Sequence, residues 1–118
     1  AAFTKLNSVA SPSEEESVGQ FFHILDTVSQ TRGCARAGED RYEITVYTSC
    51  CNMDRGIYYY TTYENRQIAA VDMYREDLDG TEVVSYPLVR AQQIYFQNGA
   101  VVTPEDGKAI VRGPSARQ

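Results

Sequence analysis

The segment Tyr47–Tyr63, YTSCCNMDRGIYYYTTY, restricts the possible folds of this chain more than any other part of it. β-Branched and aromatic residues fill both ends of the segment, and such residues favour strands. The intervening Asn52–Gly56 contains Asn, Asp and Gly, which favour turns. We therefore predict two antiparallel strands joined by a short loop.

This hairpin is expected to extend into a three-stranded meander. We place the first strand at about Tyr42–Cys50, the second at Ile57–Tyr63 and the third at Arg66 to about Met73. Glu64-Asn65 is interpreted as a two-residue turn, because Asn tolerates a positive φ. Aromatic residues on both faces of the second strand indicate an interior strand that is covered on both sides.

An amphipathic helix is predicted before the meander, ending near Ser29. Two residues can cap it: Ser11 followed by Pro12, or Ser13 with Glu16 three residues later. One apolar stripe recurs at helical spacing and suits packing on a sheet; it consists of Val18, Phe21, Phe22, Leu25 and Val28.

Both ends of the chain carry weaker patterns. Ala1–Leu6 has the spacing of a helix end without a capping residue before it, so we interpret the chain as a fragment of a longer protein. Short strands are expected at Glu82–Leu88 and Ile94–Phe96. We assign residues 1–98 to one domain portion and residues 99–118, rich in Gly, Pro and basic residues, to a loosely held tail.

Composition excludes several classes of function. The net charge is -5 and the 11 Lys and Arg residues are scattered, so no nucleic-acid partner is expected. No apolar stretch approaches the roughly 18 residues that cross a membrane. The cysteine count of 3 is odd, which fits reduced thiols and a cytoplasmic location better than a disulfide framework.

The cysteines are the first candidates for chemistry. Cys50 and Cys51 are adjacent on a predicted strand, so their side chains should point to opposite faces. With that geometry the two thiols cannot readily bind one metal ion, and a bond between them would need a distorted backbone. Cys34 lies alone in a predicted loop.

Other polar and aromatic residues also have plain structural interpretations. Glu14–Glu16 suits a charged first helical turn better than an acidic metal or partner site. His23 borders the apolar stripe, and its nearest acid at helical spacing is Asp26, a common surface pairing. Tyr58–Tyr60 could stack a ligand, but cross-strand packing is the simpler interpretation. The acidic residues of Arg75–Gly80 do not match a calcium loop.

Three segments together resemble the C-terminal third of the choloylglycine hydrolase family, which contains bile salt hydrolases and penicillin V acylases. They are EEESVGQFFHILDTVSQTRG, YEITVYTSCCNMDRGIYYYTTYENRQIAAVDMYREDLDG and a short SYPL strand. The helix and the tyrosine-rich hairpin look closer to the bile salt hydrolase branch. The resemblance covers about Ala1–Asn98 and leaves the tail unmatched. It implies an α+β fold: a helix and an antiparallel β-meander from the C-terminal part of an N-terminal-nucleophile αββα sandwich.

The resemblance also implies an activity. This activity is hydrolysis of the amide that joins a bile acid to glycine or taurine, by an N-terminal cysteine whose free α-amino group helps activate the thiol. The nucleophile and its supporting residues fall upstream of Ala1, and Cys34, Cys50 and Cys51 are internal. We therefore predict no catalytic, cofactor-binding or metal-binding residue in this chain, and no activity for the chain alone.

The partners implied are conjugated bile salts as substrate of the full-length enzyme, the rest of the hydrolase chain, and further copies in a homo-oligomer, a tetramer in the family. No cofactor is expected. Two alternatives stay open: an amidase of the penicillin V acylase type, and a non-enzymatic β-meander module that binds through its tyrosines.

Overall fold

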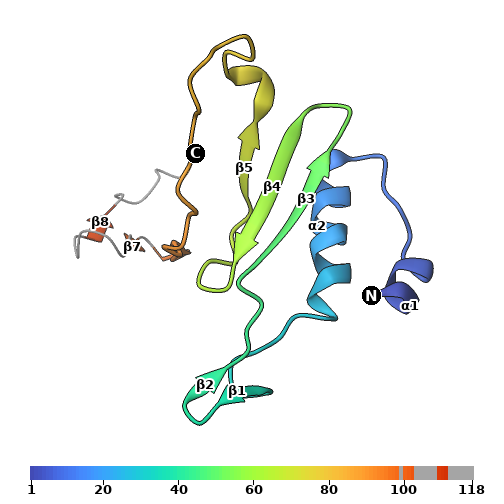
Figure 1. Cartoon of the computed structure of the whole chain (residues 1–118), viewed down its shortest axis with the longest axis vertical. Helices are drawn as coiled ribbons and strands as arrows, with labels where there is room; N and C mark the ends of the chain where they lie inside the picture. Colours follow the sequence, from blue (N-terminus) through green and yellow to red (C-terminus); the bar gives the residue numbers. More distant parts are fainter. Residues whose placement is uncertain (99, 103–108, 112–118) are drawn as a thin grey trace.

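The computed structural model describes residues 1–98 and the backbone of 100–102 and 109–111 (Figure 1). The order of elements confirms the predicted α+β class. The helices are α1 (Ala2–Leu6), α2 (Glu14–Asp26) and a 3-10 turn, η1 (Met73–Arg75). The strands are β1 (Arg36–Gly38), β2 (Arg41–Tyr42), β3 (Tyr47–Asn52), β4 (Ile57–Thr62), β5 (Ala69–Asp72), β6 (Ile94–Tyr95), β7 (Ala100–Val102) and β8 (Ala109–Val111).

The predicted meander is present as an antiparallel sheet in the order β3-β4-β5. Cys50 lies opposite Tyr59, and Tyr59 lies opposite Ala70. Directly opposite residues of an antiparallel pair point to the same face, so this row shares one face of the sheet. The row Cys51, Tyr58 and Val71 occupies the other face.

Helix α2 covers only the first of these faces (Figure 1). Its Phe22 is 7% exposed and is the most buried residue of the predicted stripe, whereas Val28 is 61% exposed and lies beyond the helix end. On the second face Tyr60 and Thr62 are buried, but Tyr58 is 38% exposed. The prediction that both faces of β4 are covered thus holds at one end of the strand and is wrong at the other.

The start of α2 follows the local sequence signal. Ser13 is the N-cap, and its hydroxyl accepts a hydrogen bond from the N–H of Glu16 at 3.4 Å. Ser11, the other candidate cap, instead bonds the Glu16 carboxylate and accepts the N–H of Ser13. The helix ends at Asp26, earlier than predicted.

The prediction of one strand over Tyr42–Cys50 is wrong for the first half of that range. Residues 43–46 are irregular, and the segment before them forms the projecting β1–β2 hairpin, whose residues are all exposed (Figure 1). Thr45 explains the break, because its N–H donates to the Gln30 carbonyl at 3.0 Å and its hydroxyl accepts the N–H of Gln30 at 2.8 Å. These bonds hold Thr45 against the loop after α2.

The connection between β4 and β5 also differs from the prediction. Residues 63–68 join the strands in place of a two-residue turn, and no non-glycine residue in the described part of the chain has a positive φ. Asn65 is 2% exposed; its N–H donates to the Thr62 hydroxyl and its side-chain oxygen accepts the N–H of Gln67. Asn65 therefore shapes the connection through buried hydrogen bonds.

The predictions for the C-terminal region have mixed outcomes. Residues 82–88 form no strand, whereas Ile94 and Tyr95 form β6 as expected. Strand β6 pairs with β7, which pairs with β8. The tail predicted for residues 99–118 lies outside the described residues apart from these two strands, so its loose order stays a prediction.

The β3–β4 turn depends on one glycine. The side-chain oxygen of Asn52 accepts the N–H groups of Asp54 and Arg55, both at 3.1 Å. The chain then turns back at Gly56, where φ is +62°. A Cβ added there would lie 2.8 Å from the ring of Tyr74, whose flexible side chain can move away. The left-handed backbone is therefore the main reason for glycine at this position.

We predict that Gly56→Ala destabilises the β3–β4 hairpin by about 1–2 kcal/mol, because an L-residue is strained at this φ. Hydrogen exchange of the β3 and β4 amides should then accelerate by about five- to thirtyfold. Gly19→Ala is the matched control: Gly19 lies within α2 with open space around it, so the same change should slow exchange there. Equal exchange in the hairpin of wild type and Gly56→Ala would contradict this account.

Candidate functional site

A polar cluster joins the first turn of α2 to the β3–β4 hairpin. The Glu14 carboxylate accepts hydrogen bonds from the Tyr59 hydroxyl at 2.8 Å and from the Asn52 amide at 2.7 Å. It also forms an ion pair with Arg55. These bonds, that of Tyr59 above all, lower the pKa of Glu14 from 4.5, although partial burial opposes the change.

The interactions of this cluster hold the first turn of α2 against the β3–β4 hairpin. Its hydrogen bond to Glu14 raises the pKa of Tyr59, so the phenol stays a protonated donor. Glu14 is ionised at neutral pH and its oxygens are already engaged by three partners. The sequence favoured a charged first turn for Glu14 over a metal or partner site. It did not predict this cluster, because the partners come from the hairpin, 38–45 positions away along the chain.

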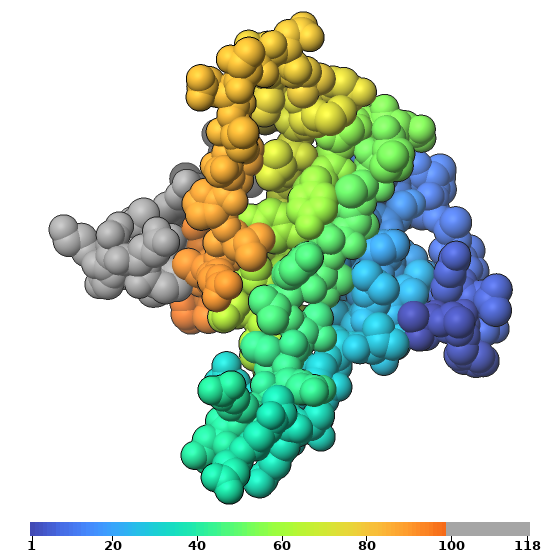
Figure 2. Space-filling model, in the orientation of Figure 1, coloured from blue at the N-terminus to red at the C-terminus, as the bar shows by residue number. Residues whose placement is uncertain are grey.

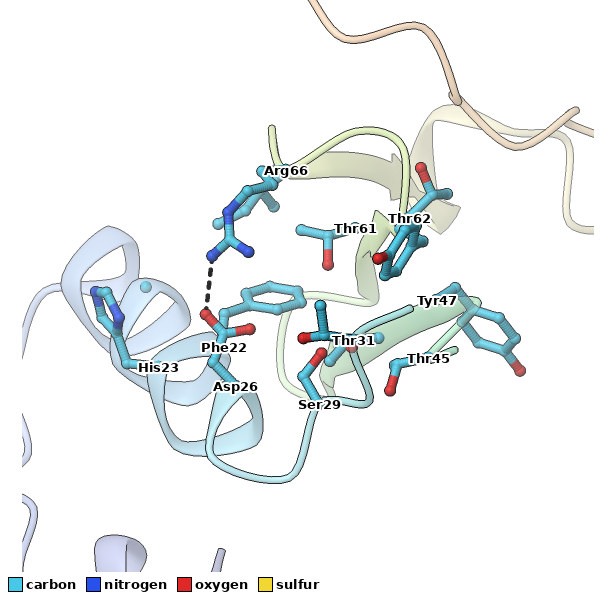
Figure 3. A pocket seen from close by; sticks show the side chains of 14 residues that line it. Phe22, His23, Asp26, Ser29, Thr31, Thr45, Tyr47, Thr61, Thr62 and Arg66 are labelled. Atoms are coloured by element: carbon cyan, nitrogen blue, oxygen red, sulfur yellow. Dashed lines mark hydrogen bonds and ion pairs between the residues drawn. The ribbon is translucent and has the colours of Figure 1, made fainter. Parts of the chain in front are cut away.

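A pocket of about 460 Å³ lies between α2 and the sheet (Figure 3). Its wall includes Phe22 from the helix and Thr48 and Thr61 from the strands. An ion pair between Asp26 and Arg66, 3.1 Å long, links the helix to the β4–β5 connection beside the pocket. The lining offers apolar contacts and hydroxyl groups.

Among the described residues that line this pocket, His23 has no catalytic partner. It lies on the helix side, away from the threonines (Figure 3). Asp26, the acid at helical spacing, bonds Arg66. Within the described residues the pocket lining contains no cysteine, so it has no thiol nucleophile beside the imidazole.

The cysteines lie as the strand pattern predicts. Cys50 shares the face of Tyr59 beneath α2, and Cys51 shares the opposite face with Tyr58. Burial, and secondarily the neighbouring Cys51, raise the pKa of the Cys50 thiol, which disfavours the reactive thiolate. All three cysteines are free, and Cys34 and Cys51 are exposed.

No cluster of three or more potential metal ligands occurs in the described part of the chain. Among those residues, the longest helix is also too short and too polar to span a bilayer.

The Glu14 cluster predicts a pH dependence. Because the folded pKa of Glu14 is lowered, its contribution to stability is full above the ordinary value of 4.5 and is lost as the pH falls through the lower folded pKa. Glu14→Gln should therefore lower the melting temperature of α2, followed by circular dichroism, at pH 7. The difference from wild type should shrink as the pH falls below 4.5.

Glu15→Gln is the matched control, since Glu15 is exposed in the same helical turn. Its effect should be smaller and limited to the helix dipole. Equal losses in the two variants at pH 7 would contradict a special role for Glu14.

The chain is similar to several bacterial proteins named bile salt hydrolase/transferase. It is 52% identical over 98 residues to that of Lactiplantibacillus plantarum, covering 83% of this chain and 30% of the relative. The relative from Clostridium perfringens is 47% identical over 79 residues, covering 67% and 24%. That from Bifidobacterium longum is 30% identical over 84 residues, covering 71% and 26%. The chain thus spans less than a third of each relative's length.

Comparison with solved structures supports the same relationship. Two crystal structures of variants of the conjugated bile acid hydrolase from Clostridium perfringens superpose with a TM-score of 0.68 at 43% identity. Each match covers 82% of this chain and 28% of the other. The α+β arrangement is therefore that of part of the bile acid hydrolase fold, as the resemblance implied.

The profile of one protein family matches residues 1–86, which include α1, α2 and the whole meander. That family is described as linear amide C–N hydrolases, choloylglycine hydrolase family. This match, together with the sequence identities above, shows that the chain belongs to the choloylglycine hydrolase family of linear amide C–N hydrolases.

Proposed function

We propose that this chain is the C-terminal part of a bile salt hydrolase, a cysteine amidohydrolase that cleaves the amide of glycine- or taurine-conjugated bile salts. The observation that carries the proposal is the 52% identity over 98 residues to the bile salt hydrolase/transferase of Lactiplantibacillus plantarum. The relatives from Clostridium perfringens and Bifidobacterium longum, which bear the same name, support it.

In this proposal the chain supplies scaffold. The β3-β4-β5 sheet and α2 form one sheet layer and one helix layer of the αββα sandwich. The second face of the sheet, with Tyr58 partly exposed and Cys51 exposed, receives the second sheet from the rest of the enzyme. Apolar exposure on this face supports the arrangement, because a stable sheet face is normally covered by another layer.

The reacting groups come from elsewhere in the enzyme. An N-terminal cysteine attacks the amide carbonyl with help from its own α-amino group, and glycine or taurine leaves as the amine. Cys34, Cys50 and Cys51 cannot take this role, because an internal residue has no free α-amino group. The raised pKa of Cys50 further disfavours its use as a nucleophile.

We extend the proposal to the setting of the enzyme. It works without a cofactor, as a homo-oligomer in the cytoplasm. The three free cysteines support a reducing compartment. Exposed apolar residues such as Phe3 and Leu6 on α1 support burial against other segments or other copies.

An assay of the protein that contains this chain tests the proposal. That protein should release glycine from glycocholate and taurine from taurocholate faster than it hydrolyses penicillin V, measured by amine release and by loss of the penicillin. The isolated 118-residue chain should release neither amine. Cys34→Ser and Cys51→Ser in the larger protein should leave the rate unchanged, because both thiols lie outside the proposed chemistry.

A faster reaction with penicillin V would replace the substrate assignment by an acylase. Amine release by the isolated chain, or loss of activity in Cys34→Ser with the fold intact, would contradict the assignment of the nucleophile to another segment.

A further inference from the structure

Among the described side chains, burial concentrates at a polar corner of the sheet. Four of these residues are buried, and three of them, Tyr60, Thr62 and Asn65, lie together at the end of β4. The fourth, Phe22, lies on α2. Buried polar groups need hydrogen-bond partners. The partners of Tyr60, Thr62 and Asn65 therefore show which segment packs on this corner.

The corner holds the main chain of one residue from a distant segment. The Tyr60 hydroxyl accepts the N–H of Val89 at 3.0 Å. The Val89 carbonyl accepts hydrogen bonds from the Thr62 hydroxyl at 3.1 Å and from the Asn65 amide at 3.4 Å. Side chains of the meander thus hydrogen-bond both the N–H and the carbonyl of Val89. In a sheet, the main chain of a neighbouring strand would bond these two groups.

Two glutamines continue this contact in a reciprocal way. The side-chain oxygen of Gln92 accepts the N–H of Arg66 at 3.0 Å, and that of Gln67 accepts the N–H of Gln93 at 3.1 Å. Figure 2 shows the C-terminal segment, in orange, lying against the yellow-green atoms of the meander. We call Val89–Gln93 the strap. Among the described residues, the hydrogen bonds that join it to the meander all involve a side chain.

The segment before the strap is an exposed, irregular connection. Residues 77–88 are all exposed and contain no strand or α-helix. The Tyr86 hydroxyl bonds Glu76, which closes this connection into a loop at its far end. The ion pair between Arg90 and Glu64, 3.7 Å long and exposed on both sides, adds little to the hold.

We propose that Val89–Gln93 is a releasable strap that closes over the Tyr60 end of the otherwise open sheet face. The side-chain clamp keeps it shut, and the exposed loop before it lets it open as a unit while the β3-β4-β5 hydrogen bonds stay intact. Opening uncovers Tyr60 and Thr62 and so enlarges the face that another layer can cover. This device does not depend on the substrate assigned above.

Trypsin measures the opening directly, because the Arg90–Ala91 bond lies inside the strap. In the full chain, Gln92→Ala removes the acceptor of the Arg66 N–H and should speed cleavage at Arg90 about tenfold. Gln92→Glu keeps an oxygen at that position and should cleave like wild type. Each rate is divided by that of the same bond in a synthetic peptide of residues 84–98 with the same residue at position 92, which removes intrinsic protease preference.

Two internal controls complete the experiment. Cleavage after Arg41, in the exposed β1–β2 hairpin, should not change in any variant. Gln97→Ala, an exposed position beyond β6, should leave the Arg90 rate unchanged. An unchanged Arg90 rate in Gln92→Ala, an equal rise at Arg41, or equal rates for Gln92→Ala and Gln92→Glu would each overturn the proposal.

Discussion

The pairing of β3 with β4 is the interaction on which the rest of this structure depends. Its register sets Cys50 opposite Tyr59 and Cys51 opposite Tyr58, and so decides which side chains meet α2. A shift of one residue would turn every side chain of a strand to the other face. The Asn52–Gly56 turn fixes this register through the Asn52 hydrogen bonds and the left-handed Gly56.

From this pairing follow the two unlike faces of the sheet. One face receives α2, through Phe22 and through the bonds of Glu14 to Asn52 and Tyr59. The other face is closed at one end by the strap and exposed at the end that carries Tyr58. A layer that is finished on one side only is consistent with a chain that spans less than a third of its bile salt hydrolase relatives.

Local signals in the sequence predicted local features well. Ser13 was one of the two N-caps predicted for α2, and the run Ile57–Tyr63 predicted β4 almost to its ends, because capping and β-propensity act over a few residues. The family resemblance is confirmed. It rests on identical residues spread over several segments, so an error in predicting one strand does not affect it.

Features that depend on partners far away in the sequence could not be predicted from the sequence pattern. The β-propensity of residues 43–46 is overridden by the bonds between Thr45 and Gln30. Asn65 looks like a surface turn residue in the sequence, yet it is buried because Val89 and Thr62 satisfy its hydrogen bonds. The Glu14 cluster likewise becomes visible only once α2 is placed over the hairpin, because its partners share no sequence spacing with the helix.

The proposed function requires that another layer of the larger protein covers the sheet face that carries Cys51. Thiol labelling with a maleimide tests it most directly, with Cys34, exposed in the loop after α2, as the internal reference. In the isolated chain, Cys51 and Cys34 should both react readily. In the native larger protein, Cys34 should still react and Cys51 should be protected. Equal labelling of Cys51 in both forms would contradict the account.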